Sequence, residues 1–115
     1  MAASNDTVVN LEELKEIMDN DMELIQDCFA DFLQDWPGVF AEINAAVLAK
    51  DAHKLDTSAH KLKGTLRYLA AAPAADAAYA LESAGKNCDM EAVETKLSSL
   101  KNECQKLIDY IHNFK

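Results

Sequence analysis

The strongest constraint on the fold is a repeating apolar pattern near the end of the chain. Between residues 90 and 114, an apolar side chain recurs at every third or fourth position. The members of this stripe are Met90, Val93, Leu97, Leu100, Cys104, Leu107, Ile111 and Phe114. The spacing places them on one face of a helix of roughly six turns or more, which we expect to begin after Asp89 as its N-cap. Such an apolar face has to be buried against other elements of similar length.

A second stripe of the same type predicts a partner helix in the middle of the chain. Its members alternate spacings of four and three, and they are Leu55, Ala59, Leu62, Leu66 and Leu69. This alternation is typical of a helix in a bundle. Asp51 is well placed to cap the first turn of this helix.

Two further helices are predicted near the N-terminus from their capping residues. Asn10 with Glu13, and Asn20 with Glu23, have the spacing of a capping box, so a helix should begin at each asparagine. The first should be short and the second should run to about Trp36. One face of the second helix collects the apolar side chains Met22, Ile25, Phe29, Phe32 and Trp36.

The prolines and glycines suggest where helices are interrupted. Pro37 and Gly38 predict a break, followed by a further helix over residues 39–50. Pro73 predicts the first turn of another helix, and Gly85 predicts its C-terminal end.

The composition agrees with an all-α fold. The chain has 115 residues, of which only three are glycine and two are proline, so it lacks the frequent turns of a sheet protein. This length suits one domain over residues 1–115, with its core at about 10–112. Because short connections favour antiparallel neighbours, we expect an antiparallel four-helix bundle with one or two short N-terminal helical elements.

The cysteines and the absence of a long apolar segment indicate in which cellular compartment the protein is expected. Cys28, Cys88 and Cys104 are odd in number, far apart and without metal-ligand spacing, which favours free thiols in a reducing environment. No run reaches the roughly 18 apolar residues of a membrane span, and the first residues do not resemble a secretion signal. We therefore expect a soluble cytoplasmic protein that does not contact the membrane.

The charges are unevenly distributed along the chain. The net charge is −9, and residues 1–42 hold eleven acidic residues against one basic residue, Lys15. Such a segment repels nucleic acid and anionic lipid, so neither is an expected partner. Residues 53–68 have the opposite balance, because they contain one acidic residue, Asp56, and four basic residues, Lys54, Lys61, Lys63 and Arg67.

A histidine lies within this basic segment, on the side of its helix that should face solvent. At about 100° per residue, His60 falls roughly 140° from the centre of the apolar stripe, and Gly64 falls roughly opposite that centre. A neutral exposed imidazole has a ring nitrogen free to act as a nucleophile. A lysine three residues on, Lys63, can reach an anion on or near the ring. A glycine inside a helix costs about 1 kcal/mol, and access of a partner to the imidazole would explain Gly64.

The residues from Ala59 to Gly64 read A-H-K-L-K-G, and this pattern resembles the signature of histidine-containing phosphotransfer (HPt) domains of multistep phosphorelays. The size, the helix order and Leu81-Glu82 about twenty residues later also resemble that family, over about residues 10–112. The chain differs from the common pattern at Thr65-Leu66, and at Leu69-Ala70-Ala71 where Leu-Gly-Ala is often found.

The resemblance implies a phosphorelay intermediate and not an enzyme. It implies that His60 accepts a phosphoryl group at Nε2 from a receiver-domain aspartyl phosphate and passes it to another receiver aspartate. Lys63 would stabilise the phosphate and Gly64 would leave room for the receiver, while Lys61, Arg67 and Asp56 would contribute to docking. The partners would be response-regulator receiver domains and/or a hybrid sensor histidine kinase, and a monomer is expected. No cofactor is expected on this chain, because the catalytic Mg²⁺ would belong to the receiver.

Three alternatives remain open from the sequence. His53, Asp56 and His60 share one broad face and could hold a metal, although Lys63 beside them would repel a cation. The basic patch around His60 could instead serve a non-catalytic helical interaction module, since charged stripes are commonly solvated faces. His53 and His112 are alternative nucleophiles, but neither is followed by the lysine and glycine that accompany His60.

Overall fold

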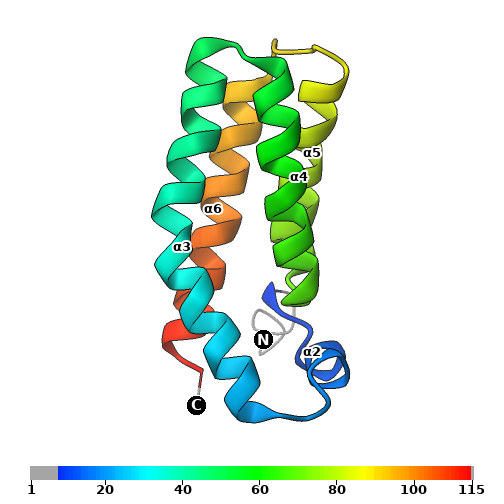
Figure 1. Cartoon of the computed structure of the whole chain (residues 1–115), viewed down its shortest axis with the longest axis vertical. Helices are drawn as coiled ribbons and strands as arrows, with labels where there is room; N and C mark the ends of the chain where they lie inside the picture. The colour runs from blue at the N-terminus through cyan, green and yellow to red at the C-terminus, as the bar shows by residue number, and fades with distance from the viewer. Residues whose placement is uncertain (1–7, 115) are drawn as a thin grey trace.

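The protein is a bundle of four long antiparallel helices with one short helix across an end (Figure 1). The structure, a computed structural model, describes residues 8–114, and within that range every regular element is a helix. The helices are α2 (Leu11–Ile17), α3 (Met22–Ala49), α4 (Ala52–Tyr68), α5 (Ala72–Lys86) and α6 (Val93–His112). The prediction of an all-α four-helix bundle with a short N-terminal element is confirmed.

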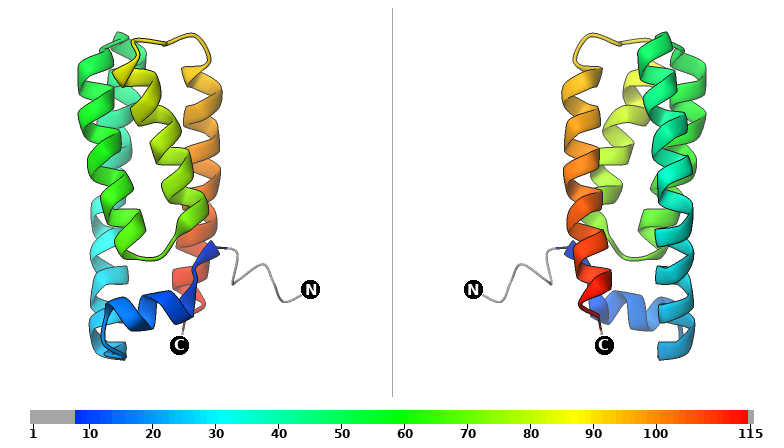
Figure 2. Two further views of the ribbon diagram at one scale, coloured as in Figure 1. Left: turned by 90° about the vertical axis from the view of Figure 1, so that its right-hand side faces the viewer. Right: turned by 90° about the vertical axis from the view of Figure 1, so that its left-hand side faces the viewer.

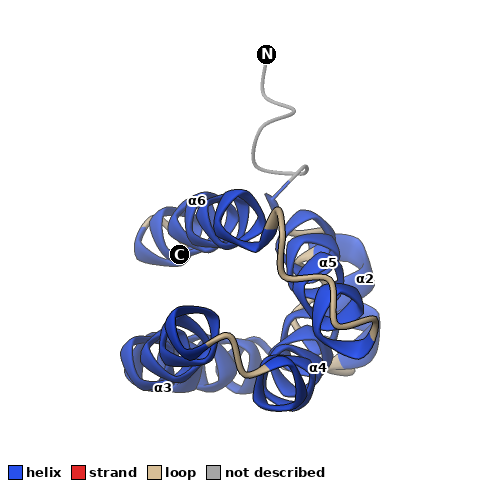
Figure 3. Cartoon of the chain, turned by 90° about the horizontal axis from the view of Figure 1, so that it is seen from above, coloured by secondary structure: helices blue, strands red, loops and turns tan. Residues whose placement is uncertain are grey.

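The four long helices follow one another around the bundle in the order of the sequence. Viewed along the bundle, α3, α4, α5 and α6 lie in succession, so that α4 has α3 on one side and α5 on the other (Figure 3). The side views show that α2 lies across the end of the bundle at which α3 begins and α6 ends (Figure 2). This arrangement gives α4 two flanks, each against a different helix.

Two of the predicted helix caps are confirmed, and a third is shifted by one residue. The side chains of Asn10 and Asp51 each accept a hydrogen bond of 3.1 Å from the backbone N–H three residues later. The cap of α3 is Asp21, whose carboxylate accepts from the N–H of Leu24 at 3.1 Å. Asn20 instead takes the left-handed conformation, with φ of 58°, and completes the turn out of α2. Both residues are good cap formers, and the preceding turn determines which one is used.

The predicted break at Pro37 is wrong, because α3 continues through this proline to Ala49. A proline inside a helix removes one hydrogen bond and costs about 3 kcal/mol. Pro37 lies on the exposed face, and the opposite face stays in phase across it, with Phe32 before it and Ile43 after it both buried. Burying an apolar side chain of this size contributes about 1.5–3 kcal/mol, so several of them outweigh the cost of the proline.

The predicted role of Pro73 is confirmed, and α5 ends at Lys86, one residue after the predicted end, although Gly85 is not its cap. Pro73 lies in the first turn of α5, but Gly85 is buried inside this helix and the cap is Asn87. Cys88 takes the left-handed conformation that a terminal glycine would favour, with φ of 54°. The last helix begins at Val93 and not directly after Asp89, since residues 89–92 are not helical.

The core is built from the predicted apolar stripes. Every member of the α4 stripe is at most 3% exposed, and so are Leu100, Cys104 and Leu107 of α6. Burial raises the pKa of the Cys104 thiol to about 12, so this residue behaves as an apolar side chain. Alanines occupy most of the inner face of α5, and these are Ala74, Ala75, Ala78 and Ala84. Such small side chains allow α5 to approach α4 closely.

The turn between α4 and α5 contains an alanine in a conformation that glycine adopts more readily. Ala70 is buried and has φ of 56°, a conformation that costs a residue with a Cβ roughly 1–2 kcal/mol. Its carbonyl accepts a hydrogen bond of 2.9 Å from the backbone N–H of Asn10. The N-terminal segment thereby fixes the turn that leads from α4 into α5.

Candidate functional site

His60 lies on the outer surface of α4, as its helical wheel predicts. Its side chain is 66% exposed. Gly64, one turn later, is exposed too, and a Cβ built at this position would have no atom within 4 Å apart from its chain neighbours and the backbone of its own helix. The glycine is therefore not required by packing within the protein. It leaves the surface beside the imidazole low and open.

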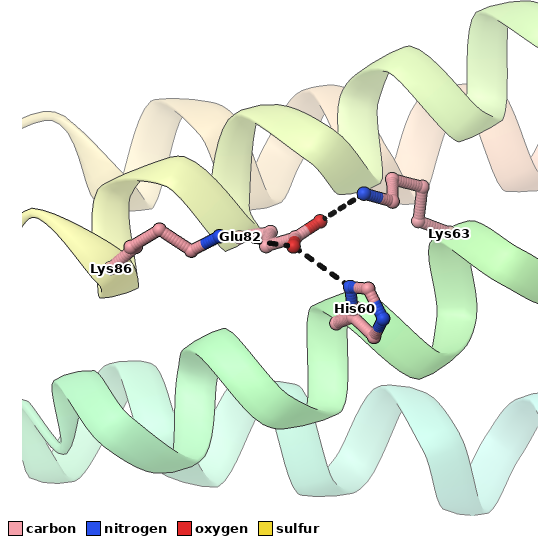
Figure 4. A network of polar contacts seen from close by, with 4 residues as sticks. All are labelled: His60, Lys63, Glu82 and Lys86. Atoms are coloured by element: carbon pink, nitrogen blue, oxygen red, sulfur yellow. Dashed lines mark hydrogen bonds and ion pairs between the residues drawn. The ribbon is translucent and has the colours of Figure 1, made fainter.

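A buried carboxylate lies beneath the imidazole. The side chain of Glu82 on α5 is only 4% exposed, and its Oε2 is 2.8 Å from Nδ1 of His60 (Figure 4). Its other oxygen, Oε1, is 2.7 Å from Nζ of Lys63. Nζ of Lys86, one turn after Glu82 on the same helix, lies 3.8 Å from Oε2. One carboxylate thus connects a histidine and two lysines.

These contacts determine the charge of Glu82 and which nitrogen of the His60 imidazole carries the hydrogen. The hydrogen bond from Lys63 lowers the pKa of Glu82 most strongly; burial opposes this effect, and the contact with His60 adds to it. The carboxylate is therefore ionised at neutral pH and can only accept hydrogen bonds. Nδ1 of His60 must then carry the hydrogen, which leaves the lone pair of a neutral ring on Nε2.

Lys63 is held more firmly than the sequence suggested. Its side chain is only 12% exposed, and its ammonium also lies over the ring of Tyr79, 5.1 Å from the centroid. The sequence predicts a lysine that can reach an anion on or near the imidazole. In the structure the ammonium is paired with Glu82, and Lys86, whose side chain is 66% exposed, is the freer of the two lysines.

Close contact between α4 and α5 brings Glu82 to His60. Gly85 lies three residues after Glu82, on the side of α5 that meets α4. A Cβ at this position would be 2.6 Å from both the carbonyl oxygen of Ala52 and the backbone nitrogen of Asp56. A side chain here would force the two helices apart. Gly85, and not Gly64, is therefore the glycine that the fold requires.

The other predicted residues are spread over the surface around His60. Lys61 and Arg67 are exposed, and Asp56 is half-buried on the edge of α4 that faces α5. His53 in the first turn of α4 and His112 in the last turn of α6 are both exposed. Within residues 8–114, no group of three or more His, Cys, Asp or Glu side chains is arranged to hold a metal ion. None of the helices in this range is long and apolar enough to cross a membrane.

Glu82 belongs to the site, but the sequence analysis predicted no role for it. The pair Leu81-Glu82 contributed only to the family resemblance, and no role followed from it. The available signal was a lone glutamate in an otherwise alanine-rich helix face. Its neighbours Ala78 and Gly85 are buried, so a charge between them needs a partner on the adjacent helix.

The fold and the site together define a class of protein. They describe a helical bundle in which one of the exposed histidines, His60, has Nδ1 paired with a buried carboxylate and Nε2 left free. Residues 27–110 match the Hpt domain family, and because this match spans most of the chain, the protein belongs to that family. Separate searches of curated proteins and of solved structures found no match.

Proposed function

We propose that this protein is a phosphorelay intermediate that carries a phosphoryl group on Nε2 of His60. The observation that carries the proposal is the pairing of an exposed imidazole with a buried, ionised carboxylate at Nδ1. Membership of the Hpt family supports it, since this family implies phosphotransfer with receiver or kinase domains. The donor would be an aspartyl phosphate on one receiver domain and the acceptor an aspartate on another.

The chemistry follows from the fixed tautomer. The Nε2 lone pair attacks phosphorus, an N–P bond forms, and the bond from phosphorus to the aspartate oxygen breaks. The electron pair returns to that carboxylate. The ring then carries hydrogen on Nδ1 and phosphorus on Nε2, and the resulting positive charge is stabilised by Glu82. Transfer to the next aspartate reverses these steps, and the retained proton keeps the imidazole a good leaving group.

The roles of the neighbouring residues follow from their positions. Lys63 and Lys86 add positive charge close to a phosphoryl group of charge near −2, which favours the phosphorylated state. Gly64 leaves space for the approaching receiver. The Mg²⁺ that neutralises the transferring group would be held by the receiver and not by this chain.

The test is a phosphotransfer profile against isolated receiver domains. The wild-type protein should acquire an acid-labile, base-stable phosphate from a phosphorylated receiver and pass it on. His60→Gln should lose this label while keeping its fold, because most of the His60 side chain is exposed and Glu82 keeps its ion pair with Lys63. His53→Gln and His112→Gln are the matched controls. Labelling retained in His60→Gln would overturn the proposal, and binding without any phosphate on the wild type would favour an interaction module.

A further inference from the structure

An exposed aromatic side chain lies next to the lysine of the site. Tyr79 is the only aromatic residue of α5, and it is 52% exposed, in a helix that is otherwise rich in alanine. Its ring centroid lies 5.1 Å from Nζ of Lys63, within the distance over which an aromatic face attracts a cation. Because so much of the ring is open to solvent, burial accounts for little of its placement.

Two groups on one face of α5 contact the same ammonium. Tyr79 and Glu82 are three residues apart, so their side chains lie on the same side of this helix. Lys63 reaches both of them from α4, with its Nζ 2.7 Å from Oε1 of Glu82. Within residues 8–114, Glu82 is the only carboxylate that pairs with Lys63. The ring of Tyr79 is therefore a second contact that restricts where this ammonium lies.

The position of Lys63 affects the charge of Glu82. The hydrogen bond from Lys63 is the strongest of the effects that lower the pKa of this carboxyl group, and burial acts in the opposite direction. Lys86 is the weaker partner, since its Nζ is 3.8 Å from the carboxylate and its side chain is largely exposed. If Lys63 moved away, a buried carboxylate oxygen would lose its partner, which disfavours the ionised form.

A phosphoryl group on His60 would compete with Glu82 for this lysine. Such a group carries a charge near −2 at neutral pH, and a lysine three residues later on the same helix can turn toward it. The ammonium would then leave Oε1 of Glu82, and the carboxylate that balances the charge of the phosphorylated ring would be weakened. The contact with Tyr79 favours the position of Lys63 on Glu82 over this alternative.

We propose that Tyr79 is a positioning residue, whose ring holds the ammonium of Lys63 on Glu82 while His60 gains and loses its phosphoryl group. The inference rests on the proposed function for the use of the imidazole, whereas the contact itself needs no phosphate. An exposed contact between a cation and a ring shifts the balance between held and released lysine roughly two- to fivefold. Tyr79→Leu should lose this factor, and Tyr79→Phe should keep it, because phenylalanine also presents an aromatic face.

The experiment begins with the whole, unphosphorylated chain and follows two groups by NMR. A ring beside the ammonium shifts the signals of the Cε protons of Lys63 upfield, and Tyr79→Leu should move them toward those of exposed lysines. In the same variant the pKa of Glu82, followed at its carboxyl carbon as the pH is varied, should rise toward its ordinary value. Tyr79→Phe should keep both wild-type values. A tyrosine that only stabilised the helix would change the free energy of unfolding without changing either signal.

Tyr68→Leu is the matched control, because it removes a tyrosine of nearly equal exposure, 50%, from the end of α4. It should leave the Lys63 signals and the pKa of Glu82 as they are in the wild type. Unchanged values in Tyr79→Leu, or an equal change in Tyr79→Phe or in Tyr68→Leu, would each overturn the inference.

Transfer kinetics separate this inference from the proposed function. Single-turnover transfer from a phosphorylated receiver to His60 should be roughly two- to fivefold slower in Tyr79→Leu and unchanged in Tyr79→Phe. Transfer that is equally fast in the wild type and in Tyr79→Leu would leave the proposed function standing and reject the role of Tyr79. If the NMR changes occur as expected but the wild type takes up no phosphate, the hold of Tyr79 on Lys63 is supported and the proposed function is rejected.

Discussion

At the scale of single residues, the contact between His60 and Glu82 gives the first prediction. Glu82→Gln keeps the shape of the side chain but removes the charge that, under the proposed function, would stabilise a protonated, phosphorylated ring. A hydrogen bond to a charged group contributes about 1.5–3 kcal/mol, so transfer should slow roughly tenfold or more. Single-turnover transfer kinetics measure the rate, and ¹⁵N NMR of the imidazole should show that Nδ1–H is no longer the only tautomer.

A matched variant separates this effect from a general loss of charge. Glu103→Gln on α6 also removes a glutamate that is paired with a lysine, 3.5 Å from Lys106, but far along the chain from the site. It should leave both the transfer rate and the imidazole spectrum unchanged. A wild-type rate in Glu82→Gln would show that the carboxylate has no part in transfer.

The pKa of Glu82 predicts a dependence of stability on pH. The hydrogen bond from Lys63 lowers this pKa in the folded protein, whereas a glutamate in the unfolded chain titrates at about 4.3. The stabilisation by Glu82 is therefore fully present above about pH 4.3, and it is lost as the pH falls through the lower, folded value. Urea unfolding between pH 6 and pH 3 should show a steeper acid-induced loss of stability in the wild type than in Glu82→Gln. Equal slopes would mean that the ion pair contributes nothing to this dependence.

At the scale of helices, two glycines that look alike in the sequence should respond oppositely to the same substitution. Gly64→Ala meets open space and should stabilise α4 by up to about 1 kcal/mol. Gly85→Ala places a Cβ 2.6 Å from the backbone of α4, and relieving that overlap should cost about 1–3 kcal/mol. Urea denaturation of both variants measures the difference. If Gly85→Ala is more stable than the wild type, α5 can move away from α4 without a loss of stability.

The helices show which parts of the fold the sequence determines locally. The caps at Asn10 and Asp51 and the apolar stripes of α4 and α6 were predictable, because each depends on residues within a few turns. The passage of α3 through Pro37 was not, since local propensity favours a break and only burial on the far side reverses it. The buried place of Gly85 depends on how closely a second helix approaches, which no pattern within α5 reveals.

The candidate site also has features that the sequence predicts and features that depend on how the helices pack. The exposure of His60 and of Gly64 follows from the wheel of a single helix, so the sequence predicted both. The pairing of Lys63 with Glu82 joins residues on two helices and depends on the register between them. Contacts of this kind depend on how the helices pack. For that reason, neither the ion pair of Lys63 nor a role for Glu82 could be predicted from the sequence.

At the scale of the whole molecule, stability and charge distribution conflict along α3. Glu23, Asp27, Asp31 and Asp35 follow one another at intervals of four residues and are all exposed, in a chain whose net charge is already −9. Each like-charge pair at this spacing destabilises a helix by about 0.2–0.5 kcal/mol. Folding therefore gains nothing from this ladder of carboxylates.

The last prediction follows from this conflict. Asp31→Lys converts two repulsive pairs, with Asp27 and with Asp35, into attractive ones, so it should stabilise the protein by roughly 0.8–2 kcal/mol at low salt. The gain should shrink as added salt screens the exposed charges. Asp76→Lys on α5 makes the same change in net charge between Ala72 and Ala80, and should give a smaller gain. Urea denaturation at two salt concentrations measures both variants, and an equal gain in the two would show that only net charge matters.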